Sequence, residues 1–358
     1  MSCFRHSGLF ITWLLVIQGL ISCSEHNRSA MIDDIMSEYA DPSGPGASVL
    51  VMRDDTILFS RAYGLADVTT GELMTTGHNF RLASVTKQFT AMTILMLKEA
   101  GKLSLEDPIH RFFPDFPEYG RDIRVRHLLT HTSGLVDYED LIPDTMMRQV
   151  HDSDCLSLMK STDSLYFVPG TKYQYSNTGY ALLALITERV TGARFADVLR
   201  DSIFRPLGLR TTLAFEEGIS SVHHRAYGHS RNTEGWIKTD QSQTSAVLGD
   251  GGIYSNPGEL ATWVSALWHH RLIPDSLQRQ AWSKAVLNDG QPIDYGYGWH
   301  LDNPAGPSYP HHDGSTMGFR NHILVYPDRK KMIVVLTNRN EGKPRQLAER
   351  IAALYRDE

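Results

Sequence analysis

Hydrophobic residues recur with the period of strands near both ends of the chain and with the period of helices between them. Residues 47–52 and 56–63 alternate around a polar turn, which predicts a β-hairpin, and residues 322–326 and 332–336 predict a second pair of strands around another polar turn. Helical spacing predicts six further elements, at residues 30–39, 88–101, 179–191, 196–203, 257–270 and 345–355.

This distribution places strands at the two ends and helices in the middle. The simplest architecture unites both ends in one antiparallel sheet flanked by helices, with a helix-rich subdomain at roughly residues 95–290 inserted between them. We therefore expect an α+β fold in the form of an α/β sandwich. No internal repeat and no low-complexity tract interrupts the pattern.

The first residues differ from this globular pattern. Arg5 precedes an apolar run over residues 9–21, which is too short to span a bilayer and has the form of an export signal. The run ends in Leu20-Ile21-Ser22-Cys23, which resembles the bacterial lipobox. The resemblance implies a signal peptide over residues 1–22, acylation of Cys23 and a polar tether over residues 23–30. Ser24 resembles an outer-membrane address, so we expect a lipid-anchored protein in the bacterial envelope, facing the periplasm.

Composition narrows the possible partners. The 358 residues carry a net charge of −6, with 41% hydrophobic and 21% charged residues, as in an ordinary globular domain over residues 31–358. No Lys- or Arg-rich stripe is present, which argues against a nucleic-acid partner. Of three cysteines, Cys3 leaves with the signal and Cys23 takes lipid, so Cys155 remains alone as a structural residue without a disulfide framework.

Candidate chemistry begins at Ser84-Val85-Thr86-Lys87, at the start of a helical period. Residues i and i+3 share one face of a helix, so the hydroxyl of Ser84 and the amine of Lys87 can meet. A weak nucleophile beside a base is the minimum requirement for acyl transfer. The alternative is a capping serine followed by a solvated lysine.

Two further polar motifs follow at long range. Tyr175-Ser176-Asn177 lies in a polar loop that opens a helix, and His312-Asp313-Gly314 lies just before a predicted strand. Each has a structural alternative when taken alone. The first fits an asparagine cap beside a packed tyrosine, and the second fits a glycine-rich turn with a surface histidine.

In this order, S-x-x-K, Y-x-N and H-x-G resemble the motifs of the serine β-lactamase and penicillin-binding protein superfamily. The chain is most similar to its class C β-lactamase-like group, which includes D,D-peptidases, D-aminopeptidases and carboxylesterases. Residues 126–135 resemble a hallmark loop of that group, and residues 251–255 resemble its Gly-Gly segment. The resemblance runs from about Ile32 to the C-terminus and implies a β-lactamase/transpeptidase-like fold.

The resemblance assigns roles to individual residues. It makes Ser84 the acylated nucleophile and makes Lys87 and Tyr175 the pair that handles its proton, with the identity of the base left open. Tyr175 would also serve deacylation. It implies that Asn177 binds the acyl side of the substrate.

The remaining roles fall on the third motif. The resemblance implies that the N–H groups of Ser84 and Ser315, beside Gly314, form the oxyanion hole. It leaves two roles open for His312, which either shuttles a proton to Tyr175 or orients that tyrosine.

One departure bears on the substrate. His312-Asp313-Gly314 stands where related β-lactamases carry Lys-Thr-Gly, so an aspartate facing the cleft would repel the carboxylate of a β-lactam. We therefore expect hydrolysis of an ester or of a D-amino-acid or peptide amide. The alternatives are a true β-lactamase or D,D-carboxypeptidase, and a non-catalytic lipoprotein that binds cell-wall peptides.

Sixteen histidines raise the question of a metal. His127 and His131 are spaced i, i+4, and adjacent pairs occur at 223–224, 269–270 and 311–312, yet no H-E-x-x-H motif is present. We expect structural or surface histidines, no metal and no cofactor. The expected partner is a small-molecule or peptide substrate, selected by loops at residues 136–162 and 219–247. The oligomeric state stays open.

Overall fold

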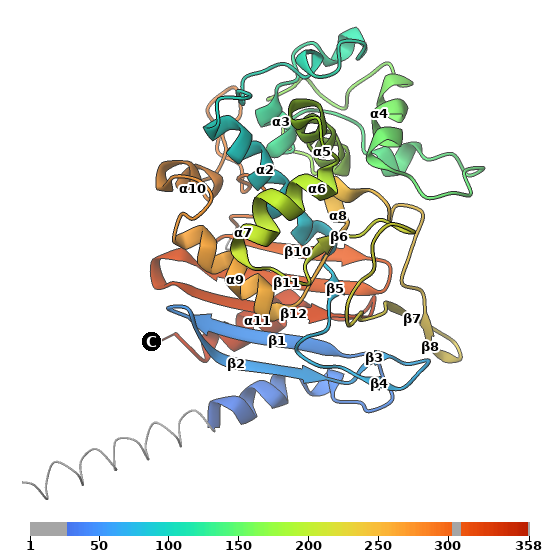
Figure 1. Ribbon diagram of the computed structural model, residues 1–358, viewed down its shortest axis with the longest axis vertical. Coiled ribbons are helices and arrows are strands. Elements are labelled where there is room, and N and C mark those ends of the chain that lie inside the picture. Colours follow the sequence, from blue (N-terminus) through green and yellow to red (C-terminus); the bar gives the residue numbers. More distant parts are fainter. Residues whose placement is uncertain (1–26, 303–308, 357–358) are drawn as a thin grey trace, which may run out of the picture.

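The computed structural model describes residues 27–302 and 309–356. A five-stranded antiparallel sheet forms the base of the molecule, and a helix-rich region rises from one edge of it (Figure 1). The expected signal peptide and Cys23 lie outside the described residues. Within them, no helix is both long and apolar enough to cross a bilayer.

Both ends of the chain build this sheet, which confirms the expected architecture. Its order is β10-β11-β12-β1-β2, and β1 pairs with β12 from Ala47 opposite Thr337 to Arg53 opposite Lys331. Its strands are β1 (Ala47–Arg53), β2 (Thr56–Tyr63), β10 (His311–Thr316), β11 (Phe319–Tyr326) and β12 (Lys331–Thr337).

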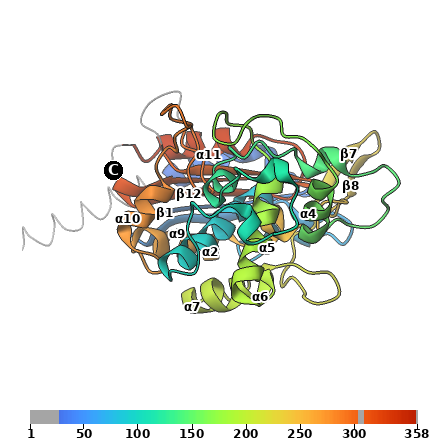
Figure 2. The same ribbon diagram turned by 90° about the horizontal axis from the view of Figure 1, so that it is seen from above.

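Alternation along these strands gives the sheet two apolar faces. Val49 and Val335 pack beneath α11 (Pro344–Ala353) and the helix at residues 27–35, whereas Leu50 and Leu336 face the larger core. Figure 2 shows the resulting layers, with α11 on one side of the sheet and α9, α2 and then α6 and α7 on the other. The helix at residues 27–35 begins inside the stretch expected to be a tether.

The remaining helices lie on the side of the larger core. Their bounds are α2 (Lys87–Glu99), α3 (Val125–Leu129), α4 (Asp152–Lys160), α5 (Asn177–Thr191), α6 (Phe195–Leu199), α7 (Arg205–Leu207), α8 (Leu248–Gly251), α9 (Pro257–Trp268) and α10 (Asp275–Ala281). Short strands connect them, namely β3 (Leu65–Asp67), β4 (Glu72–Leu73), β5 (Phe80–Arg81), β6 (Leu213–Ala214), β7 (His229–Asn232), β8 (Gly235–Lys238) and β9 (Ile253–Ser255).

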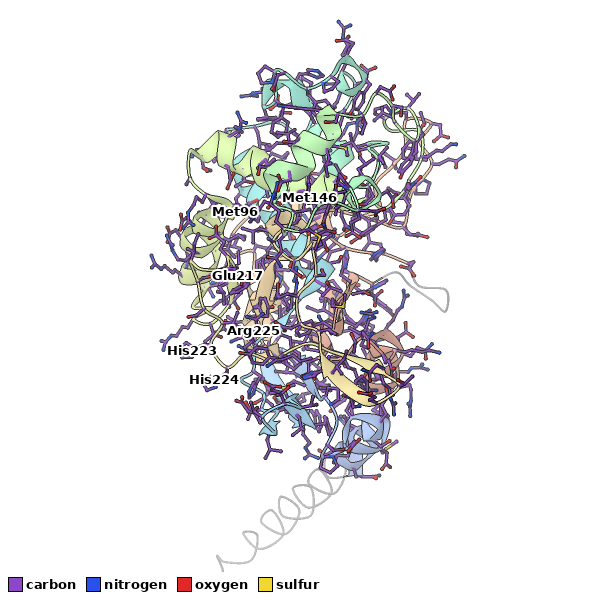
Figure 3. All side chains as sticks on the ribbon, turned by 90° about the vertical axis from the view of Figure 1, so that its right-hand side faces the viewer. Met96, Met146, Glu217, His223, His224 and Arg225 are labelled. Atoms are coloured by element: carbon purple, nitrogen blue, oxygen red, sulfur yellow. The ribbon has the colours of Figure 1, made fainter. Side chains whose placement is uncertain are left out.

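The two segments expected as cleft-edge loops carry secondary structure. Residues 136–162 contain α4, and residues 219–247 contain the β7–β8 hairpin. The second segment is anchored by Arg225, which pairs with Asp240 and stacks near the Tyr254 ring. Figure 3 shows Arg225 following His223 and His224 along one side of the molecule, and both histidines are exposed.

The third motif lies in a strand and not just before one. His312-Asp313-Gly314 lies within β10, the edge strand, where Asp313 pairs with His322 and Gly314 with Asn321 of β11. Pairing with β11 outweighs the weak strand propensity of aspartate and glycine, and it excludes the glycine-rich turn that was the structural alternative. The predicted helix over residues 196–203 is confirmed but changes type, since α6 ends at Leu199 and a π-helical turn over Arg200–Phe204 leads directly into α7.

Candidate active site

Ser84 lies on a tight 3₁₀ turn, Ala83–Thr86, between β5 and α2. The residue before it, Ala83, has a φ of 51°, a left-handed conformation that alanine rarely adopts. Neighbours hold this turn in place, because Leu82 N–H donates to the Ile253 carbonyl at 2.8 Å and the Asn321 amide donates to the Arg81 carbonyl at 2.8 Å. Strained backbone conformations that the surrounding structure holds in place are frequent at active sites.

The amine of Lys87 is fully buried directly below Ser84. Its Nζ lies 2.8 Å from Asn177 Oδ1, 3.0 Å from the Asp250 carbonyl oxygen and 3.0 Å from Ser84 Oγ. The first two atoms can only accept hydrogen bonds, so they take N–H groups. In a neutral amine the remaining lone pair is then free to accept the Ser84 O–H.

The charge state of Lys87 suits this arrangement. Burial lowers the pKa of its amine to about 8, although the carboxylates of Asp250, Asp137 and Glu139 act in the opposite direction. About a tenth of the amine is therefore neutral at pH 7, far more than for an ordinary lysine. Lys87 can accept the proton of Ser84 as the nucleophile attacks.

Tyr175 occupies the opposite side of the amine, with its ring centroid 5.0 Å from Lys87 Nζ. Burial raises the pKa of its phenol above the ordinary value, and the hydrogen-bonding contact with Ser84 offsets only part of that rise. The phenol is therefore protonated at neutral pH. This geometry favours Lys87 as the base and leaves Tyr175 as a proton donor to the leaving group.

Aromatic packing fixes the position of Tyr175. Its ring stacks on His131 at 4.1 Å between centroids, and His131 meets the ring of Tyr295 edge-on at 4.7 Å. His131 belongs to the hallmark loop and has a φ of 55°. Tyr295 is fully buried, and the sequence analysis did not single it out because no motif surrounds it.

His312 contacts this cluster through Tyr295. The Tyr295 O–H donates to Nε2 at 3.0 Å, and Nδ1–H donates to the Asp313 carbonyl at 2.7 Å. Burial lowers the pKa of His312, so the ring is neutral. Its centroid lies 6.3 Å from that of Tyr175. Both ring nitrogens are engaged with groups other than Tyr175, so of the two roles left open this geometry favours an orienting role acting through Tyr295.

Asp313 does not face the cleft. Alternation along β10 places its side chain on the opposite face of the sheet from His312, where Asp313 Oδ1 accepts from His322 Nδ1 at 2.8 Å. The expected repulsion of a β-lactam carboxylate depended on an aspartate that faces the cleft, and the structure does not meet this condition.

Gly314 lets β10 approach the nucleophile. A Cβ at this position would lie 2.2 Å from the Leu82 carbonyl oxygen, so any side chain would push the strand away from the Ser84 turn. Ser84 and Ser315 line the same pocket, as expected if their N–H groups form the oxyanion hole. The role of Gly314 is therefore close packing rather than contact with substrate.

Asn177 brings an acid to the nucleophile. Its backbone N–H donates to Asp137 Oδ2 at 2.8 Å, and its side-chain Nδ2 donates to Glu139 Oε1 at 3.1 Å. Glu139 is exposed at the pocket that Ser84 lines. Desolvation raises the pKa of Glu139 to about 7, with smaller contributions from the negative charges of Asp250 and Asp137. No motif marked Glu139 in the sequence.

Residues 32–357 match the beta-lactamase family. The chain belongs to the beta-lactamase family. It is a serine hydrolase with the β-lactamase/transpeptidase-like fold, as the order of its motifs implied. The contact of the Ser84 hydroxyl with the Lys87 amine argues against the non-catalytic alternative.

Curated relatives of this beta-lactamase family member carry two kinds of name. Penicillin-binding protein 4* of Bacillus subtilis is 34% identical, covering 88% of the chain and 73% of the relative. D-aminopeptidase of Gluconobacter oxydans is 29% identical, covering 87% of the chain. The chain spans only 59% of the length of that aminopeptidase.

Solved structures agree on the fold. The octameric penicillin-binding protein homologue from Pyrococcus abyssi has a TM-score of 0.78 at 25% identity, over 92% of this chain and 77% of that one. The D-amino acid amidase from Ochrobactrum anthropi SV3 has a TM-score of 0.79 at 23% identity, over 92% and 99%. At this identity the second likeness concerns the fold alone.

Replacing the two central hydroxyls tests the assignment. Ser84→Ala is expected to abolish hydrolysis and covalent labelling by a fluorophosphonate, because no other nucleophile adjoins Lys87 among the described residues. Tyr175→Phe removes the proton donor and is expected to lower kcat by about 10²- to 10⁴-fold. Steady-state hydrolysis of a p-nitroanilide, whose departing amine must take up a proton, measures both. Near-full activity in either variant would contradict the assignment.

The pH profile tests the base. Below pH 8 the Lys87 amine is mostly protonated and has no lone pair, so the acylation rate is expected to rise with pH through about 8 and then level off. The burst rate with an uncharged ester, measured from acid to alkaline pH, reports this titration. Lys87→Met should abolish the burst, whereas Lys98→Met on the same helix should keep the profile. A rate that falls with rising pH would exclude Lys87.

Proposed function

We propose that this protein releases an N-terminal D-amino acid from small amides or short peptides through an acyl-enzyme on Ser84. One observation carries the proposal: the Glu139 carboxylate lies in the Ser84 pocket, where its Oε1 accepts a hydrogen bond from Asn177 Nδ2 at 3.1 Å. In such a substrate the α-ammonium group is one carbon from the scissile carbonyl. The names of the aminopeptidase relatives support the D-configuration.

The charge of the pocket favours a cationic acyl group. Glu139 and Asp250 both line it, and Asp137 lies behind Asn177. Arg81 also lines the pocket, but its guanidinium donates to the Ser245 carbonyl at 2.9 Å and lies 3.4 Å from Gln241 Oε1. An ammonium group gains from these acids, whereas the carboxylate of a β-lactam is repelled by them.

The described residues account for each proton in the reaction. Lys87 takes the Ser84 proton as Oγ attacks the carbonyl, and the N–H groups of Ser84 and Ser315 stabilise the oxyanion. Collapse of this intermediate breaks the C–N bond, and Tyr175 protonates the departing amine while recovering its own proton from Lys87. A water molecule then attacks the ester under the same base and releases the D-amino acid and free Ser84.

A substitution at Glu139 separates substrate recognition from chemistry. Glu139→Gln keeps the bond with Asn177 but removes the charge, so kcat/KM for D-alanine p-nitroanilide is expected to fall about 10- to 100-fold, the range for a hydrogen bond to a charged group. The N-acetylated substrate lacks the ammonium, and its kcat/KM should be unchanged by the substitution. Stopped assays with both substrates measure the two values.

The matched control is Asp140→Asn, because Asp140 adjoins Glu139 in sequence but accepts from the Tyr166 hydroxyl at 2.9 Å. It should behave as the wild type on both substrates. An equal loss on both substrates in Glu139→Gln would contradict ammonium recognition. Faster turnover of nitrocefin or of a peptide ending in D-Ala-D-Ala would favour the β-lactamase or D,D-carboxypeptidase alternative.

We also propose that the mature protein begins at an acylated Cys23 and is held in the bacterial envelope. The apolar run at residues 9–21 and the Leu20-Ile21-Ser22-Cys23 sequence support this proposal. In a Gram-negative host, labelled palmitate should enter the full chain and be absent from Cys23→Ser, which should also leave the membrane fraction. Equal labelling of both proteins would contradict acylation at this residue.

A further inference from the structure

A cluster of histidines and acids lies on the face of the sheet away from Ser84. Strand alternation puts His311 and Asp313 of β10 on this face, and Asp313 pairs in register with His322 of β11. One ring nitrogen of each histidine and one carboxylate oxygen of Asp313 all lie within 4.8 Å of one another. In the part of the chain that the structure describes, no other group of three such side chains meets this condition.

The hydrogen bond of His311 leaves the lone pair of its other ring nitrogen without a partner among the described residues. Its Nε2 lies 2.9 Å from Asp302 Oδ1, and because an ionised carboxylate only accepts, Nε2 carries the proton. Nδ1 of the neutral ring is then an acceptor. The residue is 2% exposed, and Nδ1 is buried with no hydrogen-bond partner among residues 27–302 and 309–356. Buried polar atoms of this kind are rare and need a partner.

The residues behind His311 are arranged as they are around metal ions. A histidine ligand commonly donates its other ring N–H to a carboxylate, which fixes the tautomer and the orientation of the ring. Asp302 fills this position for His311. It is held in turn by Arg345 of α11, which donates to Asp302 Oδ2 at 2.9 Å and balances its charge.

We propose that His311, His322 and Asp313 bind a divalent transition-metal ion, with zinc as the best match. Two imidazoles and a carboxylate are typical zinc ligands, and water can take the fourth position. Ligand atoms around tetrahedral zinc lie about 3.3 Å apart at the usual bond lengths, so the three side chains need only a small closing movement.

The exposure of the cluster allows entry of an ion. The Asp313 side chain is 46% exposed and gives a route from solvent, whereas the His322 side chain is 1% exposed. When an ion enters, coordination replaces the bond from His322 Nδ1 to Asp313. The ion would tie β10 to β11 behind the strand that carries Ser315. It would serve as a brace and not as part of the hydrolytic chemistry.

This site departs from the expectation that the histidines hold no metal. The expectation rested on sequence motifs, and the three residues form no motif because only the pairing of β10 with β11 brings them together. The competing explanation is the hydrogen bond from His322 to Asp313 alone, without an ion. The two explanations differ in whether the protein binds zinc at this place.

Metal titration of the EDTA-treated full chain decides between them. Calorimetry with Zn²⁺ and absorbance with Co²⁺ should show one ion per chain and the visible bands of tetrahedral cobalt. Loss of a ligand in Asp313→Asn or His322→Gln should weaken binding by about 100-fold or more, and loss of the orienting carboxylate in Asp302→Asn by about 10- to 100-fold.

The matched control is His269→Gln. His269 also pairs with an aspartate, since Nε2 lies 2.7 Å from Asp55 Oδ2, but this pair is exposed and has no third ligand side chain nearby. Its variant should bind zinc as the wild type does. Fluorophosphonate labelling of Ser84 confirms that each variant is folded. If His322→Gln fails to fold, Asp313→Asn still tests the site, because the Asp313 side chain is half-exposed. Absence of binding in the wild type, or unchanged binding in Asp313→Asn, would overturn the proposal.

Discussion

The burial of the Lys87 amine is the constraint on which the rest of the site depends. A buried amine costs free energy unless each of its hydrogen-bonding positions has a partner. Three separate segments supply these partners, through Ser84, Asn177 and Asp250. Satisfying this single amine therefore draws α2, α5 and α8 to one point. The same burial lowers the pKa that makes the amine a base, so stability and reactivity have one physical cause.

Sequence reasoning recovered the parts of the molecule that local patterns encode. Alternation in residues 47–63 and 322–336 predicted a shared sheet, and i, i+3 spacing predicted the contact of Ser84 with Lys87. It missed β10, because histidine, aspartate and glycine have weak strand propensity and the strand exists only through pairing with β11. Tyr295 and Glu139 also escaped, since each reaches the site by tertiary packing without a local motif.

Asp313 shows how side-chain direction limits a prediction from sequence. The expected repulsion of a β-lactam carboxylate depended on an aspartate facing the cleft, and alternation along β10 turns this side chain to the other face of the sheet. The acids that do line the pocket are Glu139 and Asp250. A fold shared by penicillin-binding proteins and amidases thus leaves the choice of substrate to a few charges at the pocket, which the fold itself does not dictate.

The pairing of β1 with β12 has a kinetic consequence. Ala47 finds its partner only when Thr337 is present, so nearly the whole chain must be closed into a loop before the central strands join. High contact order of this kind slows folding. A chain that ends before β12 would lack the strand between β11 and β1, and the hydrogen-bonding edges of both would stay open to other chains. Completion of the sheet is thus a late event in folding, and chains that lack β12 are prone to aggregation.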